Sequence, residues 1–142
     1  MEGTFKKPSY ATDPRAKDIF CLPYTKEKSI PIPRKDRRAF LAQTGLNAKI
    51  SFSPDTTEQE ICRIIEDTFG RHFKRPFKYK FLSTMSSNKS KRLHMVESIY
   101  PSFKPTGRDL MMLATHGNIY IMALSELKGE IFGNVDYHFG SR

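Results

Sequence analysis

Histidine and cysteine are the side chains that most often perform nucleophilic or metal chemistry, and this chain of 142 residues has four histidines and two cysteines. No histidine has another His, Cys, Asp or Glu at a helix or hairpin spacing suited to a metal ion. We therefore expect each histidine at the surface or in a turn, and we expect no metal and no cofactor. The histidines are His72, His94, His116 and His138.

The sequence gives little support for a catalytic nucleophile. Cys21 and Cys62 are too few for a disulfide framework, and both are predicted as small buried hydrophobic residues. A dyad of Cys62 with His116 stays open, but Cys62 lies beside the apolar positions of a predicted helix, where burial would keep its thiol neutral. The chain also lacks a Gly-rich phosphate loop, Gly-x-Ser-x-Gly and His-Glu-x-x-His. We expect no catalytic residue and no small-molecule substrate; a crevice of converging polar groups would favour an unrecognised enzyme instead.

The clearest chemical signal is positive charge. The chain has a formal charge of +9, and residues 71–96 contain eight basic side chains and no acidic one. In the stretch GRHFKRPFKYKF the cations alternate with aromatic rings, a pattern that can hold phosphates and stack bases. The same alternation is also typical of a strand with core-facing rings and solvent-facing lysines. The predicted partner-binding residues are Arg71, Lys74, Arg75, Lys78, Lys80, Lys89, Lys91 and Arg92.

The preceding segment has the opposite charge. Residues 47–70 carry two basic and five acidic side chains, and Glu58, Glu66 and Asp67 are predicted on the outside of a helix. The basic surface of one copy could therefore contact the acidic helix of another. We expect an adaptor that binds an acidic protein surface or itself; the alternative is sequence-nonspecific nucleic-acid binding by the same basic face.

The best-defined element is a strand followed by a capped helix. Ile50 and Phe52 alternate with polar residues over 47–54, which predicts a half-buried strand. Thr57 and Glu60 have the spacing of a capping box. Apolar residues then recur on one helical face, and Gly70 is predicted to end the helix in a left-handed conformation. These apolar residues are Ile61, Ile64, Ile65 and Phe69.

The second half of the chain predicts a hairpin, a short helix and a final strand. Residues 77–84 and 92–98 read as paired strands around a polar turn. After a Pro-bounded loop, Thr106 and Asp109 can cap a short helix. Residues 118–124 are apolar on both faces, which is typical of a central strand covered on each side.

The N-terminal part is less regular. Residues 1–17 are predicted as a disordered or loosely draped arm, and 129–142 as a C-terminal tail. Prolines interrupt the apolar residues of 18–24 and 29–33, which favours edge strands or extended arms over central strands. Residues 34–46 fit either a short helix ending near its glycine or a strand and its turn. One domain over 18–128 is expected.

The order of these elements fits two α+β folds. With a further strand before residue 47, it gives a β-grasp: a mixed sheet wrapped across one long helix, with a short helix before the last, central strand. Without that strand it gives a ferredoxin-like βαββαβ sandwich, the layout of RNA-recognition motifs. The stretches KISFSP and KRLHMVES lack the glycines and paired rings of such motifs, which favours the β-grasp.

Several of these features together resemble a known module. They are the Leu-x-x-x-Gly-Leu turn from Leu41 to Leu46, the strand leading into an acidic capped helix, and the Ile-Tyr-Ile strand at 119–121. The succession resembles the ubiquitin-like module found upstream of HECT-type ubiquitin-ligase regions in multidomain animal proteins. The resemblance implies a β-grasp interaction module and no ligase activity.

Hydropathy predicts the compartment. Hydrophobic residues make up 38% of the chain, and no apolar run reaches the roughly 20 residues that a membrane-spanning helix needs. The first residues lack the apolar stretch of a secretory signal. The sequence therefore predicts an intracellular protein, cytoplasmic or nuclear, with no membrane contact.

Overall fold

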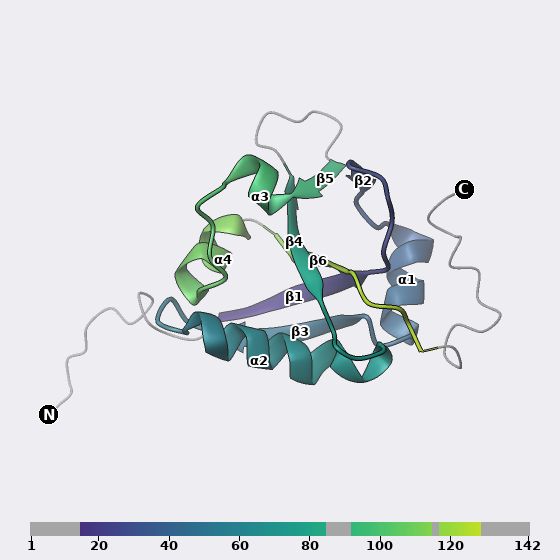
Figure 1. The fold of residues 1–142 in the computed structure, drawn as a ribbon, viewed down its shortest axis with the longest axis horizontal. Helices are drawn as coiled ribbons and strands as arrows, with labels where there is room; N and C mark the ends of the chain where they lie inside the picture. Colours follow the sequence, from purple (N-terminus) through teal and green to yellow (C-terminus); the bar gives the residue numbers. More distant parts are fainter. Residues whose placement is uncertain (1–14, 85–91, 115–116, 129–142) are drawn as a thin grey trace, which may run out of the picture.

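The computed structural model describes residues 15–84, 92–114 and 117–128, which form an α+β fold around a mixed sheet. Figure 1 shows the sheet with α2 running along it, α1 at one end, and α3 and α4 towards the other. The strands are β1 (Arg15–Leu22), β2 (Ile30–Pro31), β3 (Asn47–Phe52), β4 (Tyr79–Thr84), β5 (Arg92–Met95) and β6 (Ile119–Ala123). The helices are α1 (Lys35–Gln43), α2 (Glu58–Phe69), the 3-10 turn η3 (Gly70–His72), α3 (Val96–Ile99) and α4 (Gly107–Leu113).

The first and the last described strands, β1 and β6, lie next to each other inside the sheet. The strand order is β2-β5-β4-β6-β1-β3. β1 and β6 run parallel, with Ile19 opposite Ile119, whereas all other neighbours pair antiparallel. In β6, Ile119, Ile121 and Met122 are buried, because this strand has a neighbour on each side and is covered on both faces. The prediction of a central final strand is confirmed.

The prediction for residues 18–24 is wrong. Instead of an edge strand or arm, β1 lies between β6 and β3, and its residues from Ile19 to Leu22 are buried. Pro23 does not interrupt the strand, because it follows the last paired residue. β1 also begins at Arg15, inside the segment expected as an arm. The short β2 does lie at the sheet edge, as its prolines predict.

α2 begins with the predicted capping box. The Thr57 hydroxyl accepts a hydrogen bond from the Glu60 N–H at 3.2 Å, and the Glu60 carboxylate accepts one from the Thr57 N–H at 2.9 Å. Ile61, Ile65 and Phe69 are fully buried against the sheet. Burial of side chains of this size contributes about 1.5–3 kcal/mol each, so this apolar stripe fixes the helix on the sheet.

The predicted left-handed end of α2 is wrong. Gly70 has φ −56° and ψ −32°, a right-handed conformation. The chain does not reverse there, because it continues into η3, where the Phe73 N–H donates to the Gly70 carbonyl at 3.2 Å. This turn carries the basic stretch away from the helix.

Residues 34–46 form the helix of the two alternatives. α1 ends in a Schellman motif: Leu46 N–H donates to Leu41 O at 2.7 Å, and Gly45 N–H donates to Ala42 O at 3.3 Å. Gly45 has φ +80°, the conformation that the motif requires and that glycine adopts without strain. The Leu-x-x-x-Gly-Leu pattern is therefore the end of a helix that turns the chain into β3.

The hairpin is shorter than predicted. β5 pairs with β4 only as far as Met95, and the chain then turns into α3, so 96–98 is helical rather than extended. The predicted cap of α4 is confirmed, because the Thr106 hydroxyl accepts from the Asp109 N–H at 3.2 Å. The predicted turn at 85–91, most of the arm over 1–17 and the tail over 129–142 lie outside the described residues.

Candidate interaction site

The predicted basic residues do not all project into solvent. Arg71, Lys74, Arg75 and Lys78 are exposed, whereas Lys80 is half-buried. Arg92 is also half-buried, and its guanidinium donates to the hydroxyl and, at 2.8 Å, to the carbonyl of Ser29. It therefore fastens β5 to the segment before β2. Lys89 and Lys91 lie outside the described residues.

Three of these cations form ion pairs within the molecule. Arg75 contacts Glu66 at 2.7 Å. Lys74 contacts Glu126 at 2.9 Å, and the Lys80 ammonium contacts both Glu97 oxygens at 2.9 and 3.1 Å. All are at the surface, where such a pair contributes about 0–1 kcal/mol, so another carboxylate could replace the internal one at little cost.

The predicted basic and acidic sets meet in one of these pairs. Glu66, predicted on the outside of the helix as part of the acidic set, contacts Arg75 of the basic set. Glu58 and Asp67 are exposed on α2, and neither belongs to an ion pair within the described part of the chain. The two sets of charges therefore do not occupy fully separate surfaces.

The aromatic residues of the basic stretch face inwards. Phe73 and Phe77 are buried, and their rings stack with centroids 4.9 Å apart. Ring contacts continue from Phe77 through Tyr79 and Phe81 to Phe103, at centroid distances of 5.2, 5.7 and 5.4 Å. Because Phe73 and Phe77 lie in the core, they cannot stack on the bases of a bound nucleic acid.

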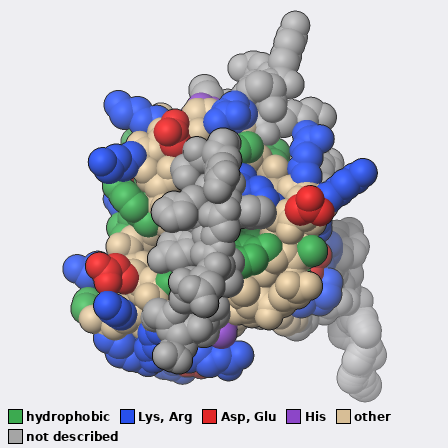
Figure 2. Space-filling view, turned by 90° about the vertical axis from the view of Figure 1, so that its right-hand side faces the viewer, with side chains coloured by type: hydrophobic (Ala, Val, Ile, Leu, Met, Phe, Trp, Pro, Cys, Tyr) green, Lys and Arg blue, Asp and Glu red, His purple; other side chains and the backbone are tan. Residues whose placement is uncertain are grey.

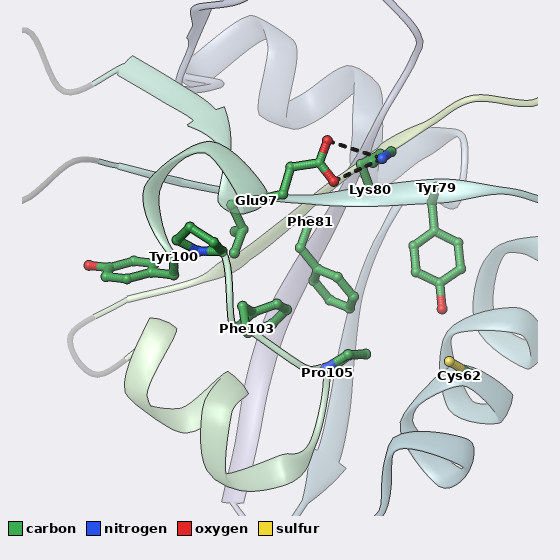
Figure 3. Close-up of a pocket in the computed structure, with 10 residues that line it drawn as sticks. Cys62, Tyr79, Lys80, Phe81, Glu97, Tyr100, Phe103 and Pro105 are labelled. Atoms are coloured by element: carbon green, nitrogen blue, oxygen red, sulfur yellow. Dashed lines mark hydrogen bonds and ion pairs between the residues drawn. The ribbon is translucent and has the colours of Figure 1, made fainter.

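A hollow of about 300 Å³ lies where this row of rings reaches the surface, and we call it the β4–α3 hollow. Tyr79, Phe81 and Phe103 line it, with Tyr100 from the loop after α3 and the paired side chains of Lys80 and Glu97 (Figure 3). Figure 3 shows Phe81 and Phe103 on the same side of β4 and the Lys80–Glu97 pair on the other side. The hollow thus combines an apolar lining with an exchangeable ion pair.

The β4–α3 hollow could not be predicted from sequence. Its walls come from α2, β4, α3 and residues 100–105, and the sequence predicts the last of these only as a Pro-bounded loop. The available signal was the presence of two rings in that loop, Tyr100 before its first proline and Phe103 between its two prolines. Rings in a short loop indicate packing against another element but do not identify that element.

Cys62 lies at the edge of the hollow. Its predicted burial is wrong, because the side chain is exposed. In a helix the next position turns by about 100°, so Cys62 points away from the buried stripe that contains Ile61. The Tyr79 hydroxyl points towards Cys62 (Figure 3), and burial, followed by a hydrogen bond with Cys62, raises the pKa of Tyr79 above its usual range. Cys21 is buried as predicted, and burial raises the pKa of its thiol.

His72 was expected at the surface or in a turn, and only the second of these holds. It lies in the η3 turn but is buried, and neither of its ring nitrogens has a hydrogen-bond partner within the described residues. Burial, and then the charges of Arg71 and Lys128, lower the pKa of His72 below its usual value. His94 lies on β5, whereas His116 and His138 are outside the described residues.

Comparisons with known proteins assign no family to the chain. Comparisons with protein-family models, curated proteins and solved structures find no match to the chain. None of the helices in the described part of the chain has the length and hydrophobicity needed to cross a bilayer. Within residues 15–84, 92–114 and 117–128, no three His, Cys, Asp or Glu side chains cluster as metal ligands would. The function is therefore inferred from the fold and its surface.

Proposed function

We propose that this chain is a non-enzymatic, ubiquitin-like module of the β-grasp type that binds an acidic protein partner. The fold part of the proposal is supported by β1, the additional strand before Asn47 that a β-grasp needs. It is further supported by α2 along the sheet and by α4, which precedes the central strand β6. A four-stranded ferredoxin-like sandwich has no place for β1 between the strands β3 and β6.

One observation carries the binding part of the proposal: the exposed end of the basic stretch adjoins the β4–α3 hollow on β4. Lys78 and Lys80 flank Tyr79, whose ring lines the hollow. Protein interfaces gain most of their affinity from a few apolar or aromatic anchors in pockets, with charges around them. An apolar side chain of the partner enters the hollow, and its neighbouring carboxylates contact Lys78 and replace Glu97 on Lys80.

The charges alone would not make this site selective. Replacing one exposed ion pair by another changes the free energy of binding by about 1 kcal/mol or less. The apolar anchor must therefore supply most of the affinity, and the lysines select acidic flanks. An intracellular location is supported by the two cysteines, because both are unpaired and cysteines usually stay unpaired in a reducing compartment.

Selection of peptides from a displayed random library tests this function. The full chain should enrich sequences with an apolar residue flanked by Asp or Glu. Binding of an enriched peptide, measured by fluorescence anisotropy, should weaken about tenfold in Lys78→Glu/Lys80→Glu and about fivefold in Tyr100→Ala. The control Lys26→Glu/Lys28→Glu makes the same change in charge on the exposed segment before β2 and should bind within about twofold of the unchanged chain.

Two results would contradict this function. Equal loss of binding in both double variants would show attraction by net charge alone, without a site at the hollow. Salt-sensitive dimers or larger assemblies in light scattering, lost in Glu58→Lys/Asp67→Lys, would replace the foreign partner with a second copy of the chain.

A further inference from the structure

A second basic surface lies outside the predicted hairpin. Residues 34–38 contain four basic side chains and one acidic one, and they form the start of α1. Arg34, Lys35 and Arg38 are exposed there. Figure 1 shows α1 at one end of the sheet, and Figure 2 views that side of the molecule, where blue basic side chains gather at several places around the rim.

The fold extends this surface at the other end of α1. A Cβ atom built on Gly45, which closes the helix, would lie 2.8 Å from the His72 ring, and Lys128 N–H donates to His72 O at 3.0 Å. Arg71 and Lys128 therefore flank the end of α1. Burial first, and then the charges of both, lower the pKa of His72. We call the set of Arg34, Lys35, Arg38, Arg71 and Lys128 the α1 face.

The charges of the α1 face are arranged differently from those of the hairpin. Within the described residues, none of its five cations takes part in an ion pair, whereas Lys74, Arg75 and Lys80 each do. Arg38 is held by stacking, because its guanidinium lies 4.9 Å from the centre of the Phe20 ring. This contact orients the planar group and leaves it charged.

Three of these cations, Arg34, Lys35 and Arg38, lie at the unfavourable N-terminal end of α1. The N-terminus of a helix carries a partial positive charge. Basic side chains near it are therefore repelled, whereas anions near it are stabilising. Arg34, the N-cap residue of α1, makes no side-chain capping bond, and Asp36 is the one acidic residue of the first turn. Repulsion among these charges lowers the stability of α1, and an anionic partner would remove that cost.

The positions of the exposed hydrophobic side chains favour one kind of anion. Among the described residues, the exposed large hydrophobic side chains are Tyr24, Tyr100, Met112 and Leu124, and none of them lies on α1 or η3. An acidic protein would need such an anchor for affinity, whereas a nucleic acid can bind through its phosphates alone. We propose that the α1 face binds the phosphate backbone of nucleic acid without reading its bases. This activity is separate from the peptide site at the β4–α3 hollow.

Fluorescence anisotropy with a labelled 20-base-pair DNA duplex of arbitrary sequence tests this inference. Affinity should fall steeply with salt, with a logarithmic slope of about 0.9 for each phosphate contact. Arg34→Gln/Lys35→Gln/Arg38→Gln should weaken binding at least about tenfold and reduce the slope by about 2 to 3. The matched control Arg63→Gln/Lys104→Gln/Arg108→Gln removes three exposed cations from other elements and should bind within about threefold of the unchanged chain.

Further variants and ligands keep the result interpretable. Arg38 packs on Phe20, so Arg34→Gln/Lys35→Gln, which leaves that contact intact, should still reduce the slope by about 1 to 2. Equal effects of the two triple variants would overturn the inference, since net charge alone would then explain binding. Tight binding of poly-glutamate through the same residues would also overturn it and make the α1 face a site for acidic protein. If the chain binds the peptide but not the duplex, only this inference fails. If it binds the duplex but not the peptide, only the proposed function fails.

Discussion

At the scale of single residues, His72 combines burial with an unfavourable charge environment. Both ring nitrogens lack partners within the described residues, and the neighbouring charges of Arg71 and Lys128 are positive. A buried polar ring without hydrogen bonds is costly, because burial removes its contact with water. Here the ring packs under Gly45, so it connects the end of α1 to η3 by shape rather than by hydrogen bonding.

The pKa of His72 predicts a loss of stability in acid. It is lowered by burial and then by Arg71 and Lys128. Because the unfolded chain takes up the proton at a higher pH than the folded chain, the contribution of neutral His72 is complete above about pH 6.5. It is lost as pH falls below that value towards the lowered folded pKa. Urea unfolding at pH 7.5 and pH 5.5 should therefore show a larger loss of stability in the natural chain than in His72→Leu, and equal losses would contradict this assignment.

At the scale of elements, the sequence correctly predicts the features that depend on residues close together in the chain. The capping box of α2 and the alternation in β3 involve residues within a few positions of each other, and both are confirmed. The position of β1 was missed because Pro23 can either interrupt a strand or follow it, and only the pairing with β6 decides. Residues 34–46 are ambiguous in a similar way, because a glycine can end a helix or form the turn after a strand.

The site depends on contacts that sequence does not specify. Lys80 meets Glu97 across 17 positions, and Lys74 meets Glu126 across 52. A count of eight cations in one segment cannot reveal these pairs, because the acidic partners come from other elements. The β4–α3 hollow likewise exists only because residues 100–105 fold back onto β4. Sequence thus locates the charge but not the part of it that is available for binding.

The end of α1 provides a test at this scale. Gly45→Ala would place a Cβ atom 2.8 Å from the His72 ring on a backbone with φ +80°. The left-handed conformation alone costs a non-glycine residue about 1–2 kcal/mol, so the free energy of unfolding should fall by at least that amount. Gly117→Ala is the matched control, because a Cβ atom there meets nothing within 4 Å and the stability should change by about 0.5 kcal/mol or less. Equal effects in denaturant titration would show that the Schellman turn is not under this constraint.

At the scale of the whole molecule, the β4–α3 hollow and the α1 face differ in composition and lie at different ends of one sheet. The β4–α3 hollow lies beside α3, whereas α1 stands at the other end, and the two surfaces share no residue (Figure 1). The hollow has rings and paired charges, whereas among the described residues neither α1 nor η3 carries a large exposed hydrophobic side chain. If both proposals hold, the chain has one site that selects by shape and another that selects by charge.

The separation predicts that the two ligands bind independently. Substitutions at distant sites with no shared partners usually add to within about 0.5 kcal/mol, which is about twofold in affinity. Tyr100→Ala should therefore leave duplex affinity unchanged to within about twofold, and Arg34→Gln/Lys35→Gln should do the same for an enriched peptide. At 0.15 M salt, where charges are screened over about 8 Å, saturating peptide should also change duplex affinity less than about twofold. Mutual exclusion of peptide and duplex in anisotropy titrations at that salt concentration would mean that both anionic ligands occupy one continuous surface, and the division of the molecule into two sites would then be wrong.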